Sequence, residues 1–185
     1  MRADARDNRE RILDAADEVF GAGGAAASTE DVARLAGVGI ATVFRHFPTK
    51  QDLLRAVLTA RLQGLRDRAR ELSEAAQPGA AFCDFFTEVV DGAGHKLSIA
   101  EALADVGGDP RGAPTRAGQE MREAFGQLLE RAQRAGAIRP DAAAPEVYAL
   151  MVGVSRATAH LPMPETVKQR MIALALDGLR PAHRP

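Results

Sequence analysis

Apolar side chains recur at helical spacing along most of the chain. The first helical stripe, at positions i, i+1, i+4, i+7 and i+8, consists of Ile12, Leu13, Ala16, Val19 and Phe20. Glycines at positions 21, 23 and 24 predict the end of this helix, because glycine is common just past a helix C-terminus. No segment of useful length alternates apolar and polar residues, so the pattern predicts an all-α fold.

A second, shorter helix is predicted to start after Ser28. The hydroxyl of Ser28 is suited to cap this helix, because Asp31 stands three residues later in a spacing close to that of a capping box. We expect Val32, Ala33 and Leu35 to supply its apolar face.

A third helix follows a tight turn marked by Gly37. Val43 and Phe47 share its apolar side, and Pro48 ends it. A short helix presented by a turn, with another helix before it, is the arrangement with which helix-turn-helix proteins enter the major groove of DNA. The pattern therefore predicts a DNA-binding regulator.

The rest of the chain is predicted to be helical too, which gives about nine helices in all. The expected segments are residues 50–75, 82–92, 97–106, 121–136, 145–160 and 164–179. Residues 107–114 contain three glycines and two prolines, so we expect a loop there.

Composition narrows the class of protein. With 185 residues, of which 46% are hydrophobic, the chain can hold one or two small domains with a proper core. No apolar run approaches the ~18–20 residues needed to cross a bilayer, and the charged N-terminus lacks the apolar stretch of a signal peptide. The single cysteine, Cys83, fits a reducing compartment. We therefore expect a cytoplasmic protein with no membrane partner.

Residues 11–53 resemble the TetR family of transcriptional regulators. The positions that carry the resemblance are Arg11, Ile12, Leu13, Ala15, Ala16, Phe20, Gly24, Ser28, Val32, Ala33, Ala36, Gly37, Val38, Thr42, Phe44, His46, Phe47, Lys50 and Leu53. The resemblance implies a three-helix helix-turn-helix domain at residues 1–50 and a helical ligand-binding and dimerisation domain at residues 51–185. It also implies a repressor that binds a palindromic double-stranded DNA operator as a homodimer and is released by a small apolar effector.

Several residues of the helix-turn-helix segment are candidates for contact with DNA. Ile40 and Ala41, at the tip of the third helix, are placed to touch thymine methyl groups, and Arg45 can read a guanine edge with two hydrogen bonds. Phe44 is expected to be buried or to stack against a sugar. Thr29, at the start of the second helix, is a further candidate for phosphate contact. The alternative for Arg45 is an ordinary solvated surface charge.

The family resemblance implies phosphate contacts for Thr42, His46 and Lys50. Packing of His46 at the helix end is the alternative for that residue. Two positions depart from the family pattern: Phe44 stands where tyrosine is common, and Gly39 stands where serine is frequent. We expect the first to remove a phenolic contact to phosphate and the second to weaken the cap of the third helix.

The charge balance predicts few phosphate contacts. Residues 1–60 contain eight Lys and Arg against nine Asp and Glu, and the whole chain has a formal net charge of −1. A DNA-binding domain usually carries a basic excess. We therefore expect a modest non-specific affinity for DNA, because few phosphates are neutralised.

The second half supplies candidates for an effector pocket and a dimer interface. The pocket candidates are Phe82, Phe85, Phe86, Val89, Leu103, Met121, Phe125, Tyr148 and Met151, and the alternative, favoured for any single one of them, is an ordinary place in the core. The last two predicted helices carry apolar residues on more than one face, so we expect a four-helix interface between two subunits. Its candidate residues are Val147, Leu150, Gly153, Val154, Ala157, Met171 and Leu174.

No catalytic motif stands out, so we predict neither an enzyme nor a cofactor. None of the four histidines has a glutamate three residues before it, and Cys83 has no partner at metal-site spacing. The chain also lacks a GxSxG motif and a phosphate-binding loop. The alternative to a regulator is a helical protein-interaction adaptor without specific DNA binding, which needs neither Arg45 nor Lys50 on an exposed face.

Overall fold

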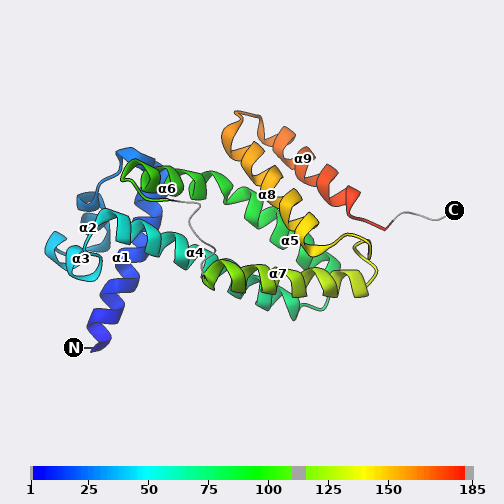
Figure 1. The fold of residues 1–185 in the computed structure, drawn as a ribbon, viewed down its shortest axis with the longest axis horizontal. Coiled ribbons are helices and arrows are strands. Elements are labelled where there is room, and N and C mark those ends of the chain that lie inside the picture. Colours follow the sequence, from blue (N-terminus) through cyan, green and yellow to red (C-terminus); the bar gives the residue numbers. More distant parts are fainter. Residues whose placement is uncertain (1, 110–115, 182–185) are drawn as a thin grey trace. The chain divides into compact units, whose positions relative to one another are not determined.

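The computed structural model of the protein describes residues 2–109 and 116–181, with side chains from residue 6 onward. Within these ranges the chain forms nine α-helices, one 3-10 turn and no strand, which confirms the predicted all-α fold (Figure 1). The elements are α1 (Arg2–Gly23), η1 (Gly24–Ala26), α2 (Thr29–Ala36), α3 (Ile40–His46), α4 (Lys50–Ser73), α5 (Pro78–Asp91), α6 (Ala93–Asp105), α7 (Arg116–Arg134), α8 (Ala144–His160) and α9 (Glu165–Gly178). None of these described helices is long and apolar enough to cross a membrane.

Three helices begin earlier than predicted: α5 at Pro78 rather than residue 82, α7 at Arg116 rather than residue 121, and α6. Helix α6 begins at Ala93 rather than at the predicted residue 97, because Gly94 is accommodated within the helix and only Gly92 separates α6 from α5. Of the predicted loop 107–114, residues 107–109 are non-helical and residues 110–114 lie outside the described ranges.

The start of α2 is a complete capping box, as the spacing of Ser28 and Asp31 predicts. The Asp31 amide donates to Ser28 Oγ at 3.1 Å, and the Ser28 amide donates to the Asp31 carboxylate at 3.3 Å. The Ser28 hydroxyl also donates to this carboxylate at 2.7 Å, and this hydrogen bond is the main cause that lowers the pKa of Asp31. The cap therefore satisfies two amides that the helix leaves without an internal partner.

The chain forms two compact units, which are described separately. Of the described residues, the first contains 2–61 and 95–109, and the second contains 62–94 and 116–181. Most of α6 belongs with the N-terminal helices, and α4 contributes residues to both units.

The first unit is built around one buried cluster that draws residues from α1, α2, α3, α4 and α6. Its members are Ile12, Ala15, Ala16, Phe20, Ala27, Val32, Ala33, Ala36, Val43, Phe47, Leu53, Leu54, Val57, Ile99, Ala102 and Leu103. The prediction that Leu35 faces this core is wrong, because its side chain is 50% exposed on the outer side of α2. With Val32, Ala33 and Ala36 already buried on the inner side of this short helix, Leu35 points away from them.

A polar cluster joins α1, α4 and α6 beside that core. The Nε2 of His95 lies 2.8 Å from the Asp17 carbonyl oxygen, and it must donate there because a carbonyl only accepts. Arg61 Nη1 donates to both carboxylate oxygens of Asp17 at 2.8 Å. The imidazole lies directly on the backbone of Gly21, where an added Cβ atom would come within 1.9 Å of Nε2. Any side chain at Gly21 therefore requires the His95 ring to shift.

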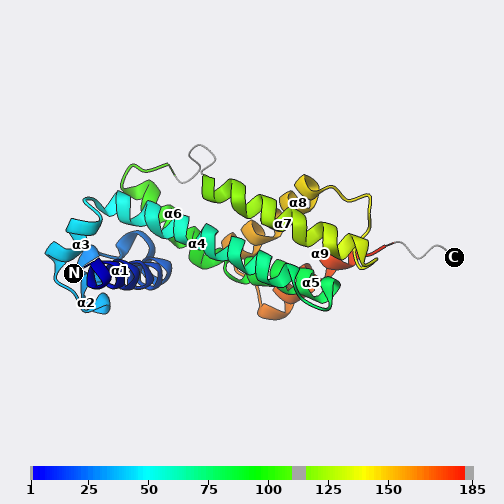
Figure 2. The ribbon, with the colours of Figure 1, turned by 90° about the horizontal axis from the view of Figure 1, so that it is seen from below.

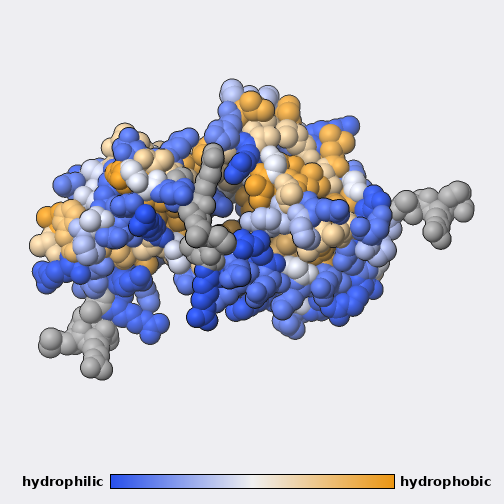
Figure 3. Space-filling view, in the orientation of Figure 1, coloured by the Kyte–Doolittle hydropathy of each residue, from blue (hydrophilic) through white to orange (hydrophobic). Residues whose placement is uncertain are grey.

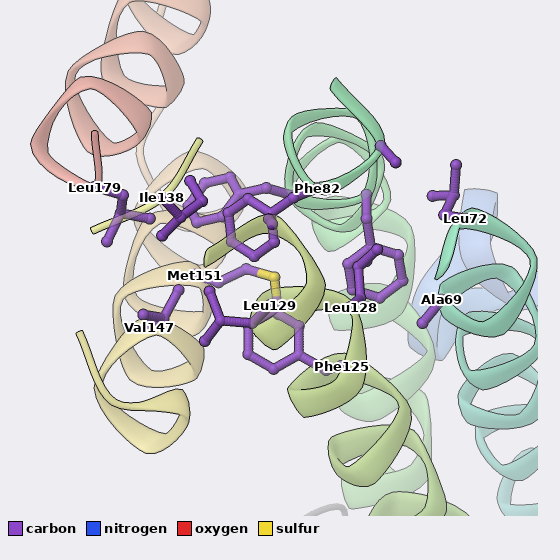
Figure 4. Packing of buried hydrophobic residues seen from close by; sticks show 14 of the residues in the cluster. Ala69, Leu72, Phe82, Phe125, Leu128, Leu129, Ile138, Val147, Met151 and Leu179 are labelled. Atoms are coloured by element: carbon purple, nitrogen blue, oxygen red, sulfur yellow. The ribbon is translucent and has the colours of Figure 1, made fainter. Parts of the chain in front are cut away.

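The second unit packs its helices around aromatic side chains. Helix α5 contacts α7, α8 and α9, and α8 also contacts both α7 and α9 (Figures 1 and 2). Phe125 lies at the centre of the aromatic group, with its ring centroid 6.1 Å from those of Phe82 and Phe85 and 5.8 Å from that of Tyr148. Figure 4 shows Phe82, Phe125 and Met151 directed into the same interior from three helices.

We expect Gly21→Ala to destabilise the protein and Gly64→Ala to stabilise it. Alanine is ordinarily better than glycine inside a helix by about 0.5–1 kcal/mol, and nothing lies within 4 Å of a Cβ atom added at Gly64. At Gly21 the methyl group meets the His95 ring, and overpacking of this kind costs about 1–3 kcal/mol. Urea unfolding of the two variants measures both effects.

The double variant Gly21→Ala/His95→Ala tests the cause of this difference. If the clash with the ring is responsible, His95→Ala destabilises the Gly21→Ala protein much less than it destabilises the wild type. Equal effects of His95→Ala in both backgrounds would contradict the contact.

Candidate DNA-binding surface

Helix α3 is fixed by one face and presents the other to solvent. Val43 is fully buried and Phe47, directly after the helix, is nearly so, as the sequence pattern predicts. The opposite face exposes Ile40, Ala41, Phe44 and Arg45. Hydrophobic residues are visible at the surface over α3, at the left of Figure 3. An exposed face of apolar, small and cationic side chains on a short helix has the chemistry required to read base edges in the major groove.

The turn before α3 depends on Gly37. Its backbone has φ +64°, a left-handed conformation that glycine adopts readily, and its amide donates to the last carbonyls of α2. At the other end of the turn, Gly39 is the N-cap residue before α3 and provides no side-chain hydrogen bond, which confirms the predicted loss of a capping hydroxyl.

Four of the eight predicted DNA-contacting residues lie on the exposed face of α3, and the other four do not. Thr42 and His46 are half-buried at its edges, and the His46 ring lies 6.4 Å from that of Phe47. Thr29 is buried, and its hydroxyl donates to the Glu30 carboxylate at 3.3 Å. Phe44 is 42% exposed, so the burial that we considered for it is not observed.

Lys50 is directed into the first unit. Its Nζ donates to the carbonyl of Ala27 at 2.8 Å and to that of Ala25 at 3.5 Å. The ammonium group also lies 5.2 Å from the centre of the Phe20 ring. In this structure Lys50 therefore binds backbone carbonyls before α2, where the sequence predicts a phosphate contact.

Sequence reasoning missed the role of Arg11. Its Nη2 donates to the carbonyls of Ala36 and Gly37, at the turn between α2 and α3. Nearby, the guanidinium of Arg9 lies 5.2 Å from the centre of the Phe47 ring, just after α3. These contacts join residues far apart in sequence, so helical spacing contains no signal for them.

Comparison with known proteins identifies this arrangement. The family described as bacterial regulatory proteins, tetR family, matches residues 12–57. The family described as transcriptional regulator SbtR-like, C-terminal domain, matches residues 77–181. The chain belongs to the TetR family of transcriptional regulators.

Two solved structures of TetR-family regulators match nearly the whole length, and a curated relative matches about three quarters of it. A TetR regulator from Mycobacterium vanbaalenii is 37% identical, with 97% of this chain and 99% of that chain covered and a TM-score of 0.81. One from Streptomyces coelicolor is 33% identical, with coverage of 94% and 99% and a TM-score of 0.80. The transcriptional regulator UidR of Escherichia coli K12 is 28% identical over 151 residues, which are 76% of this chain and 74% of UidR. The protein is thus a DNA-binding transcriptional regulator, and its family is not one of enzymes.

The predicted effector-pocket residues of this TetR regulator fall into two groups. Val89 and Tyr148 are partly buried and pack against the core of the second unit. The candidates that belong to this core are Phe82, Phe85, Phe86, Met121, Phe125 and Met151. Leu103 lies instead in the cluster of the first unit, so the structure does not bring it together with the others. The reason is that most of α6, which carries Leu103, packs with the N-terminal helices.

Two hollows in the second unit lie at its surface. One of about 330 Å³ is lined in part by Arg139, Glu146 and Leu150, and one of about 300 Å³ in part by Cys83 and Arg180. Burial raises the pKa of the Cys83 thiol. Within residues 2–109 and 116–181, no group of three or more His, Cys, Asp or Glu side chains is arranged to hold a metal ion.

The predicted dimer residues on α8 and α9 are partly at the surface. Val147 is buried in the core of its own unit, whereas Leu150, Gly153 and Leu174 are exposed and the remaining three are half-buried. Leu161 and Val167 add two exposed apolar side chains near the connection of the two helices. Figure 3 shows hydrophobic residues gathered over α8 and α9.

We expect Arg45→Ala to weaken binding to a preferred duplex by about 1–3 kcal/mol and to relax base preference at one position. Arg45 projects from the exposed face of α3, and its Nε donates to the Ala41 carbonyl of the same helix, at 3.2 Å. Fluorescence anisotropy with single-base variants of the duplex measures the preference. Arg134→Ala, which removes the same charge from α7, is the control. A uniform loss on every sequence would show that Arg45 contacts phosphate instead.

Proposed function

We propose that this TetR regulator is a ligand-responsive repressor that binds a palindromic operator as a homodimer and is released by a small apolar effector. The observation that carries the proposal is the face of α3: Val43 and Phe47 anchor the helix, and Ile40, Phe44 and Arg45 remain available to DNA. One short helix reads only a few base pairs, so a two-fold dimer on a palindrome is needed for useful specificity.

The exposed apolar side chains of α8 and α9 support a dimer. Leu174 is 60% exposed and Leu161 is 59% exposed, so α9 and the residue directly after α8 leave apolar area that a partner can cover. Gly153 adds a place where a second helix can approach closely, because nothing lies within 4 Å of a Cβ atom added there. A symmetric pairing of α8 and α9 with the same helices of a partner covers this surface.

The aromatic interior of the second unit supports an apolar effector. The rings of Phe82, Phe85 and Tyr148 lie around that of Phe125, and the Tyr148 hydroxyl supplies a polar group for orientation. Because these rings are packed in this structure, an effector must separate them to enter. Its binding energy then favours a second arrangement of the helices, and release of DNA follows if that arrangement binds the operator less tightly.

Selection of binding sequences from a pool of random duplexes tests the DNA-binding part. We expect enrichment of a palindromic sequence, followed by binding to it at least a thousandfold tighter than to a scrambled duplex, as is typical of specific regulators. Anisotropy at two salt concentrations measures both affinities. Failure to enrich any sequence would favour the interaction adaptor over a specific regulator.

Leu174→Glu tests the dimer. We expect light scattering to report twice the 19.6 kDa chain mass for the wild type and the single mass for the variant, with loss of operator binding. The reason is that a buried carboxylate at the centre of an apolar interface has no partner. Gln63→Glu places the same charge on the exposed side of α4 and should change neither property. A monomeric wild type at micromolar concentration would contradict the proposed interface.

A further inference from the structure

Helix α3 exposes two large apolar side chains. Ile40 is 37% exposed and Phe44 is 42% exposed, and they stand one helical turn apart, so they share one side of the helix. We propose that Ile40 and Phe44 bind the 5-methyl groups of thymines in the major groove, and that Phe44 thereby determines base preference. This inference rests on the proposed function and names the base chemistry of each half of the operator.

The exposed side of α3 is divided by chemistry. Three pairs of residues, each pair one helical turn apart, follow one another around the helix: Ile40 and Phe44, Ala41 and Arg45, and Thr42 and His46. The first pair is apolar, the second combines a small side chain with a cation, and the third is half-buried and can form hydrogen bonds. Because Val43 and Phe47 are buried, the helix is held with the first two pairs toward solvent. The apolar pair therefore lies beside the arginine that is expected to read guanine.

The Phe44 ring matches one feature of the major groove. Thymine carries a methyl group at its major-groove edge, whereas the other bases present hydrogen-bond donors and acceptors there. A phenyl ring has neither, and covering a polar edge without a hydrogen bond is unfavourable. Contact with a methyl group instead removes apolar area of both partners from water. With no phenolic hydroxyl to bind a phosphate, Phe44 is suited to a role in base preference.

The spacing of the two side chains sets the spacing of the thymines. The Cβ atoms of residues one turn apart lie about 5–6 Å from each other, and successive base pairs are about 3.4 Å apart along the duplex. The methyl groups that Ile40 and Phe44 contact therefore belong to thymines within about two base-pair steps, on one strand or on opposite strands. Since Arg45 lies on the adjacent pair, a guanine is expected within the same few base pairs.

Replacement of thymine by uracil in the DNA tests the contact. Uracil pairs as thymine does and lacks only the methyl group, so the hydrogen-bonding pattern of the groove is unchanged. In the duplex enriched from the random pool, each thymine is replaced in turn at the same position of both half-sites. We expect about a fourfold loss of affinity for each methyl group that α3 covers, or about fifteenfold for the symmetric pair, and less than about a twofold loss at other thymines. Fluorescence anisotropy measures these affinities.

Phe44→Ala assigns one of the contacts to its side chain. For this variant, the loss caused by uracil should fall to less than about twofold at one thymine position and stay unchanged at the position that Ile40 contacts. Ile40→Ala should show the reverse. A residue that only stabilises α3 would weaken binding to the thymine and uracil duplexes by the same factor. Phe44→Leu keeps an apolar side chain and should retain most of the uracil effect.

Leu35→Ala is the matched control. Leu35 is another large apolar side chain of the first unit, 50% exposed, but it belongs to α2. Its truncation removes a similar apolar area from the surface and leaves α3 unchanged. The loss that uracil causes at each thymine should therefore equal that of the wild type.

Two results would overturn the proposal. One is a wild type whose affinity is insensitive to uracil at every thymine of the half-site. The other is a uracil effect that stays the same in Phe44→Ala, because the methyl group is then contacted by another residue. If the wild type enriches no sequence at all, the proposed function itself fails. If it enriches a sequence and either of the two results is found, only the assignment of thymine contacts fails.

Discussion

The left-handed turn at Gly37 is the constraint on which the DNA-binding surface depends. Its backbone reverses the chain within three residues, so that α2 packs into the core of the first unit while α3 exposes one face. A side chain at this position meets both an unfavourable backbone conformation and the guanidinium of Arg11. The placement of Ile40, Phe44 and Arg45 follows from this turn and from the burial of Val43.

Cations in the first unit illustrate how one charge can serve fold or recognition. Arg11 and Lys50 stand at positions where a basic residue near a helix-turn-helix motif is easily assigned to phosphate, yet both reach backbone carbonyls. Among the described residues, Arg45 on the exposed face of α3 donates to the Ala41 carbonyl of its own helix. In the composition these three residues are equal positive charges. The structure distinguishes them, because Arg11 and Lys50 donate to backbone carbonyls of other elements and Arg45 does not.

The second unit combines a filled aromatic interior with an incompletely covered outer surface. Phe82, Phe85 and Phe125 are buried at the interior, and Leu150 and Leu174 lie exposed on α8 and α9. Burial of the first group stabilises the unit by itself, because apolar area is removed from water. The second group gains the same stabilisation only from a partner, which is why the proposed dimer and the proposed effector response use different parts of one unit.

The local sequence pattern was sufficient to predict the helices and to identify the DNA-reading helix. The reason is that helical spacing, the cap at Ser28 and the turn at Gly37 each depend on residues close together in sequence. It also grouped the aromatic residues that pack around Phe125. Only the tertiary structure decided that α6 joins the first unit, with Leu103 in its core, and that Leu35 faces solvent. Contacts between residues tens of positions apart produce no periodic pattern in the sequence. Only the tertiary structure therefore shows that Arg11 binds carbonyls at the end of α2 and that Lys50 binds carbonyls just before its start.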